Sequence, residues 1–268
     1  MSPKHVPPLQ TQQIKAQLKS RELGHLLELY EEVNSTNDVA KEAALNGAAH
    51  GLTIVAETQR AGRGRRGRIW TSPSSGDLYM SIVWRKKIPQ AHLALATLCT
   101  GLGVASAIEK STAKTVQIKW PNDILIAQKK AAGILVEGIG RSEGLNALII
   151  GIGVNVHREA FPADFETLAT SLCLQSDSGS PLDRGVLLCD ILKDVEDWLE
   201  QLCSSAVAPI LESMQKRLAW RGQWVLCDDV AGQIQGLDDK GALILATESG
   251  PVHLLSGSVR LRERDSKG

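Results

Sequence analysis

The chain has 268 residues, 43% of them hydrophobic and 22% charged, which is enough for one large folded domain and a small one. Lys plus Arg and Asp plus Glu each number 30, so the formal net charge is zero. A protein that coats a nucleic acid usually carries a broad positive field. The neutral balance therefore favours a small anionic ligand over a polymer.

The five cysteines and the hydropathy pattern indicate a cytoplasmic protein. The cysteines are widely spaced and form no C-x-x-C or Cys/His cluster, which argues against a disulfide framework and a structural zinc site. No apolar run approaches the roughly 20 residues of a membrane-spanning helix. The N-terminus is polar and proline-rich, unlike a secretory signal. We expect no membrane partner.

Apolar periodicity and turn residues predict alternating helices and strands in the first half of the chain. Residues 1–13 are expected to be frayed. In chain order, the predicted elements are a weakly periodic helix over 14–29, a helix over 35–45 that ends at Gly47, a strand over 52–57, a strand over 78–84 and a buried helix over 93–108. The short polar side chains of residues 35–38 can accept hydrogen bonds from the first turn of the second helix.

The middle of the chain predicts more strands, followed by two helices. These are strands over 116–119, 124–127, 132–138 and 147–156, a hairpin turn over 128–130, an irregular connection over 160–180, a helix from Asp183 to 202 and a helix over 208–219. Asp183 is predicted to cap its helix. This mixture of strands and helices predicts an α+β domain over residues 1–220.

The pattern changes after residue 220. Short apolar runs separated by Asp, Gly and Ser predict strands over 224–227, 232–237, 243–246, 252–255 and 259–262. Such short, evenly spaced strands are typical of a small antiparallel β-barrel. We therefore predict a second domain over residues 221–268.

The segment from Gly62 to Trp70 is the strongest chemical signal. Its first seven residues contain four arginines and three glycines. Glycines let the backbone approach a ligand closely, and Trp70 offers an apolar wall. The spacing matches the G-x-G-x-x-G dinucleotide fingerprint, but no helix or suitably spaced acidic residue follows, which disfavours that fold. A basic loop that binds nucleic acid remains an alternative.

Three further motifs follow in order. Lys119-Trp120-Pro121-Asn122-Asp123 places a lysine at the end of a strand before a rigid proline turn. The other two are the glycine-containing strands Gly133-Ile134-Leu135-Val136-Glu137 and Gly151-Ile152-Gly153-Val154-Asn155. Taken singly, each has an ordinary structural interpretation as a turn or a buried strand.

Together with Ser35-Thr36-Asn37 and Gln59, these motifs resemble the biotin–protein ligases from about residue 30 to the C-terminus. The resemblance implies a mixed sheet related to the class II aminoacyl-tRNA synthetases. It also implies an ATP-dependent reaction, assisted by Mg²⁺, that forms biotinyl-5′-AMP and then biotinylates a lysine of a biotin carboxyl carrier protein. Only 34 residues precede Ser35, too few for the winged-helix domain of some members, so we expect a monofunctional ligase.

The resemblance also implies roles for individual residues, and no protein-derived metal ligand, since Mg²⁺ would arrive with ATP. The implied catalytic residues are Lys119 and Arg65. The implied biotin-binding residues are Ser35, Thr36, Asn37, Gln59, Arg63, Gly64, Arg65, Lys119, Gly133 and Ile134. The implied ATP or adenylate contacts are Arg63, Arg65, Arg68, Trp70, Lys119, Asn122 and Asn155.

Two other functions remain open at this point. One is a lipoate-type ligase that forms an acyl-adenylate on the same fold, and the other is the nucleic-acid-binding protein. The sequence leaves open whether the protein is a monomer or a homodimer. We also expect residues 62–67 to be mobile until a ligand binds, because a reactive adenylate must be shielded from water.

Overall fold

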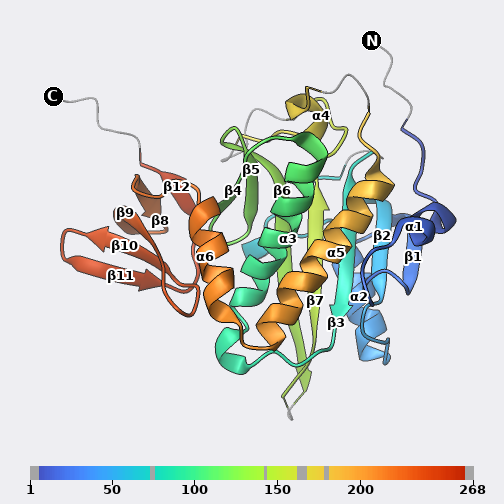
Figure 1. Ribbon diagram of the computed structural model, residues 1–268, viewed down its shortest axis with the longest axis horizontal. Helices are drawn as coiled ribbons and strands as arrows, with labels where there is room; N and C mark the ends of the chain where they lie inside the picture. Colours follow the sequence, from blue (N-terminus) through green and yellow to red (C-terminus); the bar gives the residue numbers. More distant parts are fainter. Residues whose placement is uncertain (1–5, 73–75, 142–143, 162–167, 178–180, 263–268) are drawn as a thin grey trace.

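Figure 1 shows the computed structural model of the protein, which describes residues 6–72, 76–141, 144–161, 168–177 and 181–262. A seven-stranded mixed sheet forms the centre, and two long helices, α3 (Leu95–Thr112) and α5 (Arg184–Cys203), cross one of its faces. A smaller antiparallel sheet follows at the C-terminal end of the described chain. The predicted α+β class is confirmed.

The seven strands run in the order β1-β2-β3-β7-β6-β5-β4. Their bounds are Leu27–Val33 for β1, Thr53–Gln59 for β2, Leu78–Trp84 for β3, Val116–Lys119 for β4, Asp123–Ile126 for β5, Lys129–Arg141 for β6 and Gly144–Val154 for β7. β1 and β2 are parallel, and all other neighbours are antiparallel. β7 and β6 lie in the middle of this order, so other elements of the domain can pack on them from both faces of the sheet.

Helices cover both faces of the sheet. The remaining helices are α1 (Thr11–Gln17), α2 (Thr36–Leu45), α4 (Leu172–Gln175) and α6 (Val207–Arg217), with 3-10 turns η1 (Arg65–Gly67) and η2 (Gln90–His92). The main apolar core lies between the sheet and α3 and α5, and a smaller one lies under α2. None of the helices in the described ranges has both the length and the apolar character that crossing a membrane requires.

The helix α5 begins where its sequence predicts, and it packs closely against α3. The Asp183 carboxylate accepts hydrogen bonds from the backbone N–H groups of Gly185 (2.8 Å) and Val186 (3.1 Å), which confirms the predicted cap. At the crossing with α3, a Cβ on Gly103 would lie 2.6 Å from the backbone nitrogen of Val195. The glycine therefore lets the two helices approach closely.

The predicted helix over 14–29 is wrong beyond α1, which ends at Gln17. Leu18 has a ψ of 131°, which ends the helix, and residues 27–33 form β1 instead. The hydrogen bonds of β1 come from its parallel pairing with β2, so only the tertiary structure supplies them. The predicted turn over 128–130 is displaced, since Ala127 and Gln128 form the turn and β6 begins at Lys129. The predicted irregular connection over 160–180 contains α4, and its residues 162–167 and 178–180 lie outside the described residues.

The C-terminal strands confirm the predicted all-β module. Their bounds are Trp224–Cys227 for β8, Val230–Leu237 for β9, Leu243–Thr247 for β10, Gly250–Leu254 for β11 and Val259–Leu261 for β12. They form an antiparallel sheet in the order β11-β10-β9-β8-β12. The indole nitrogen of Trp120 donates a hydrogen bond to the Gly241 carbonyl (3.0 Å), which joins this module to the strand end that carries Lys119. The domain boundary at residues 220–221 stays a prediction.

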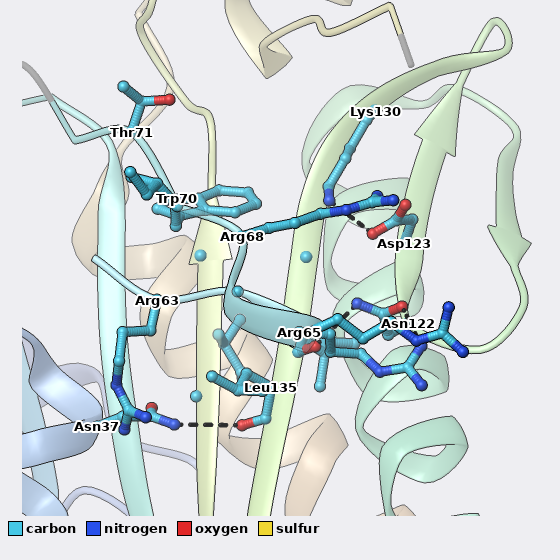
Figure 2. Close-up of a pocket in the computed structure, with 18 of the residues that line it drawn as sticks. Asn37, Arg63, Arg65, Arg68, Trp70, Thr71, Asn122, Asp123, Lys130 and Leu135 are labelled. Carbon is cyan, nitrogen blue, oxygen red and sulfur yellow. Dashed lines mark hydrogen bonds and ion pairs between the residues drawn. The ribbon is translucent and has the colours of Figure 1, made fainter. Parts of the chain in front are cut away.

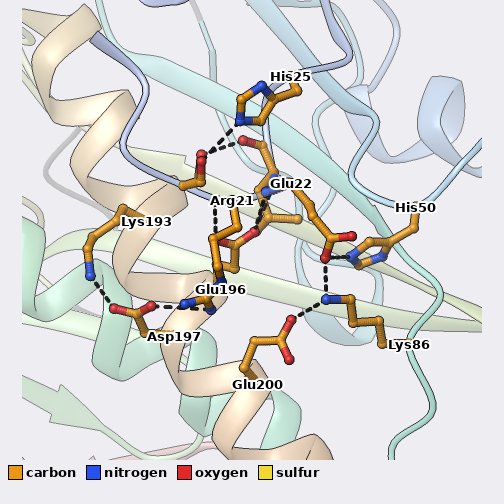
Figure 3. Close-up of polar contacts among 11 residues, drawn as sticks. Arg21, Glu22, His25, His50, Lys86, Lys193, Glu196, Asp197 and Glu200 are labelled. Carbon is orange, nitrogen blue, oxygen red and sulfur yellow. Dashed lines mark hydrogen bonds and ion pairs between the residues drawn. The ribbon is translucent and has the colours of Figure 1, made fainter.

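A buried carboxylate fixes the segment between α1 and β1 onto α5 (Figure 3). Glu196 is 1% exposed, and its carboxylate accepts backbone hydrogen bonds from Arg21 (2.5 Å), Glu22 (2.8 Å) and Leu23 (3.1 Å). A buried charge requires such partners, because burying it without them costs several kcal/mol. Lys86 also pairs with Glu22 beside this carboxylate. The cluster stabilises the N-terminal approach to the sheet on the face away from α2.

Candidate functional site

A cavity of about 580 Å³ lies where α2 begins, where β6 and β7 run side by side and where residues 62–70, here called the Arg/Gly loop, cross the sheet (Figure 2). That volume suits a ligand of cofactor size. The structure brings to this one cavity every residue to which a ligand role was assigned: Ser35, Thr36, Asn37, Gln59, Arg63, Gly64, Arg65, Arg68, Trp70, Lys119, Asn122, Gly133, Ile134 and Asn155.

The start of α2 forms a network of neutral hydrogen-bonding groups. The Gln59 carboxamide oxygen accepts from the backbone N–H of Thr36 (2.9 Å), and its amide nitrogen donates to the Ser72 hydroxyl (3.2 Å). Ser35 was expected to cap the helix, but its side chain makes no capping hydrogen bond. Gln59, reaching across from β2, supplies the acceptor instead. The Ser35 hydroxyl is thus left to line the cavity.

The Asn37 side chain packs against the backbone of β7 at Gly151. Its Oδ1 accepts from the Ser81 hydroxyl (2.6 Å), and its Nδ2 donates to Glu137 Oε2 (2.7 Å) and, more weakly, to the Leu135 carbonyl (3.5 Å). Gly151 lies directly beneath, and a Cβ there would overlap the Asn37 carboxamide. The glycine is therefore required for this close approach.

Gly151→Ala is expected to raise the KM for the small ligand by about tenfold while leaving most of the fold intact, because the added methyl displaces Asn37. Gly101→Ala is the matched control, since its new Cβ would have no neighbour closer than 3.6 Å. Steady-state kinetics of both variants and their melting temperatures test this. Equal KM values in Gly151→Ala and wild type would show that Asn37 does not shape the site.

Trp70 covers two further glycines, Gly133 and Gly153. Gly133 on β6 faces Gly153 on β7 in the strand register. A Cβ on Gly133 would lie 2.7 Å from Trp70 Cζ3, and one on Gly153 would lie 2.5 Å from Trp70 Cε2. The indole therefore rests on bare backbone. The Lys130 ammonium lies 5.3 Å from the centroid of the same ring, within range of a cation–π interaction.

The four arginines of the Arg/Gly loop contact four different parts of the protein. Arg63 pairs with Glu137 on β6, and Arg65 Nη1 donates to Asn122 Oδ1 (3.1 Å). Arg66 pairs with Asp228 (2.6 Å), and Arg68 Nη2 donates to the Ser258 hydroxyl (3.1 Å). The loop therefore connects the seven-stranded sheet to the C-terminal module. Carboxylates of the protein pair with Arg63 and Arg66, which lowers the positive charge that the loop could offer to a nucleic acid.

Burial is uneven along this loop. Arg65 is half-buried, and desolvation lowers the pKa of its guanidinium below the ordinary value. Arg66 is exposed and its partner Asp228 has a pKa lowered to about 2, chiefly by the hydrogen bond from Arg66. Because Arg65 lies deeper in the cavity, its charge is the less screened of the two.

Two lysines flank one carboxylate on the other side of the cavity. Lys130 Nζ lies 2.6 Å from Asp123 Oδ1, and Lys119 Nζ lies 3.7 Å from Asp123 Oδ2. The Lys119 side chain is 8% exposed and lies over the Trp220 ring, whereas the Lys130 side chain is 26% exposed and reaches towards Trp70. Both line the cavity, so it holds two lysines where the sequence motifs indicated one.

Lys130 was missed because the sequence pattern placed it in a turn. The ladder between β5 and β6 has an irregularity that pairs Ile124 with Ala132 but Leu125 with Lys130, leaving Ala131 as an extra residue. Such a bulge reverses the alternation of side chains. Lys130 Cε consequently lies 3.2 Å from the place of a Cβ on Gly133, on the cavity side. The sequence feature that could have identified Lys130 is its position three residues before Gly133, a residue already assigned to the site.

The side chains of Asn122 and Asn155 line the cavity and also donate hydrogen bonds to backbone carbonyls. Asn122 Nδ2 donates to the Ile134 carbonyl (3.0 Å), and Asn155 Nδ2 donates to the Thr170 carbonyl (3.0 Å). Among the described residues, no group of three or more His, Cys, Asp or Glu side chains is arranged to hold a metal ion. Asp123 is the carboxylate that lines this part of the cavity.

Comparison with known families gives two matches in chain order. Residues 29–155 match the family model described as "Biotin/lipoate A/B protein ligase family". Residues 227–262 match the model described as "Biotin protein ligase C terminal domain". The first contains the cavity floor and the Arg/Gly loop, and the second covers most of the five-stranded module.

Similar proteins span most of the chain. A biotin–[acetyl-CoA-carboxylase] ligase of Paracoccus denitrificans is 33% identical, covering 81% of this chain and 92% of that protein. The bifunctional ligase/repressor BirA of Bacillus spizizenii is 32% identical, covering 94% of this chain and 79% of that protein. The solved structure of a biotin protein ligase from Aquifex aeolicus, in complex with biotin and ATP, has a TM-score of 0.77 and 31% identity over 89% of this chain and 99% of that one.

Proposed function

This chain belongs to the biotin protein ligase family, and from that premise we propose how its cavity performs ATP-dependent biotinylation. The biotin carboxylate attacks the α-phosphate of ATP, which gives biotinyl-5′-AMP and releases pyrophosphate. A lysine amine of a biotin carboxyl carrier protein then attacks the mixed anhydride, which forms an amide and releases AMP. The enzyme is a biotin–[biotin carboxyl-carrier protein] ligase.

One observation carries this proposal, namely that a neutral hydrogen-bonding end and a cationic end share one cavity. We assign the neutral end, formed by Ser35, Thr36, Asn37 and Gln59, to the biotin head group. Gly133 and Ile134 form the adjoining floor. The cationic end then receives the carboxylate and the phosphates. This order follows the polarity of biotin, whose ring system is neutral and whose chain ends in an anion.

The first step brings two anions together, so it requires positioned cations. We propose that Lys119 remains a catalytic residue and that Lys130, which lies closer to Trp70, acts with it between the carboxylate and the α-phosphate. Arg65 and Arg68 contact the phosphates, and Trp70 forms a wall for the adenylate. Asn122 and Asn155 complete the nucleotide end by holding the backbone around it.

A Mg²⁺ ion would be held mainly by the triphosphate. Mg²⁺ usually keeps several waters and takes only one or two carboxylates from a protein, together with substrate phosphates. Asp123 is the carboxylate nearest the cationic end, and two lysines already neutralise it. The residues thus fit an ion that arrives with ATP and screens the charge of its phosphates.

No protein nucleophile is needed, because the acyl-adenylate is itself the activated species. The requirement is to exclude water until the carrier lysine arrives, and we propose that the Arg/Gly loop does this by closing over the cavity. We further propose a cytoplasmic enzyme, in keeping with its five free thiols. The domains would be residues 1–220 and 221–268, in a monomer or a homodimer.

Wild-type protein is expected to catalyse biotin-dependent exchange of pyrophosphate into ATP. Lipoate at the same concentration should support less than about a hundredth of that rate, because its dithiolane cannot satisfy the amide and hydroxyl groups of the neutral end. Transfer of labelled biotin to a carrier domain, with its acceptor lysine changed to arginine as the control, checks the second step. Exchange that depends on lipoate and not biotin would establish the lipoate-type alternative.

A further inference from the structure

One carboxylate connects the Arg/Gly loop to the neutral end of the cavity. Glu137 lies on β6, and its two oxygens accept hydrogen bonds from Arg63 Nη1 (3.0 Å) and Nη2 (2.8 Å). Glu137 Oε2 also accepts from Asn37 Nδ2 at 2.7 Å. The same side chain therefore contacts a residue of the loop and a residue at the start of α2.

The geometry distinguishes this pair from an ordinary surface ion pair. Its two parallel hydrogen bonds join a planar guanidinium to a planar carboxylate, which is the strongest and most directional arrangement of these groups. The Glu137 side chain is 27% exposed and that of Arg63 is 36% exposed, so solvent screens them only in part. Asp38 also pairs with Arg63 (2.8 Å), but its side chain is 52% exposed.

The Arg63 guanidinium is consequently directed away from the cationic end. Figure 2 shows its side chain descending towards Asn37, whereas Arg65 extends towards Asn122. Arg63 lines the cavity, and in this arrangement its guanidinium is engaged by Glu137 and Asp38, so its expected contact with biotin and nucleotide stays a prediction. Its charge serves to hold the loop in place.

We propose that Glu137 is a positioning residue that holds the Arg/Gly loop over the cavity through Arg63 and fixes the orientation of the Asn37 amide. This inference rests on the proposed function, because its effect is on an enzyme-bound adenylate. Opening the loop requires both hydrogen bonds between Glu137 and Arg63 to break. The contact should therefore control how long the adenylate is retained, more than how fast it forms.

The test is the rate at which biotinyl-5′-AMP leaves enzyme that has been separated from free substrates. Glu137→Gln keeps the size of the side chain and an acceptor for Asn37, but loses the charge. It is expected to lose adenylate roughly tenfold faster, with less than a threefold change in the KM for biotin. Glu137→Ala also leaves Asn37 without this acceptor and should raise the KM for biotin as well.

Asp38→Asn is the matched control, since it removes the exposed anion from the same guanidinium, and it should change the loss rate less than about twofold. The double variant Arg63→Ala/Glu137→Gln should lose adenylate no faster than the faster single variant, because both changes break one contact. Wild-type retention in folded Glu137→Gln, or fully additive effects in the double variant, would overturn the inference. Absence of biotin-dependent adenylate in wild type would instead overturn the proposed function.

Discussion

Lys130→Ala is expected to lower biotin-dependent pyrophosphate exchange by about 10²–10³-fold without unfolding the protein, the usual loss when one group that stabilises developing charge is removed. The reason is its position, since the Lys130 ammonium lies beside Trp70 and next to Asp123 on the cavity side of β6. Without it, two anions must approach with one fewer cation between them. Single-turnover formation of the adenylate measures this step directly.

Two further variants test whether the loss of rate is specific to the Lys130 side chain. Lys129→Ala removes the neighbouring, exposed lysine and should leave the rate within about twofold of wild type. Lys119→Ala is also expected to slow adenylate formation by orders of magnitude, as its proposed role requires. A near-normal rate in Lys119→Ala would leave Lys130 as the bridging cation, and a near-normal rate in Lys130→Ala would refute the prediction made for it.

Arg65→Gly is expected to release the adenylate at least roughly tenfold faster and to cause biotinylation of lysines outside the carrier protein. The substitution removes the half-buried guanidinium and its hydrogen bond to Asn122, and it adds a glycine to a loop that already has several. Labelling of an unrelated protein such as serum albumin, measured beside carrier labelling, reports the escaped intermediate.

Arg66→Gly is the matched control for that variant. Arg66 has a φ of 55°, a conformation that glycine adopts without strain, and it contributes an exposed ion pair with Asp228. Its release rate should rise less than that of Arg65→Gly. If the two variants release adenylate equally fast, then loop flexibility and not the Arg65 charge accounts for the effect.

Sequence reasoning predicted the elements whose local pattern matches their environment. β3 and β4 occupy the predicted residues because β3 is mostly apolar and β4 alternates apolar with polar residues, and Asp183 caps α5 through contacts with its own neighbours. β1 was missed because it is an edge strand with several exposed glutamates, and only its pairing with β2 gives it a fixed conformation. The intrinsic β-propensity of residues 27–33 does not reveal which strand they will pair with.

In the site as well, features that depend on local sequence were predicted and those that depend on tertiary structure were not. Residues in contiguous motifs were located, because the resemblance to a family identified those motifs as a set. Lys130 and Glu137 were not, for different reasons. A bulge directs Lys130 into the cavity, and strand alternation cannot predict a bulge. The sequence around Glu137 predicts only the end of a buried strand, and its partner Arg63 lies 74 residues away in the chain.

Gly133, Gly151 and Gly153 on β6 and β7 present bare backbone to the cavity, and the Trp70 indole and the Asn37 carboxamide pack directly on it. Any side chain added at these three positions would collide with Trp70 or Asn37 and would not enlarge the pocket. Efforts to admit a bulkier biotin analogue by trimming side chains must therefore begin elsewhere on the lining. Met80 and Ile152 are buried and line the same cavity, so they offer the atoms that can be removed.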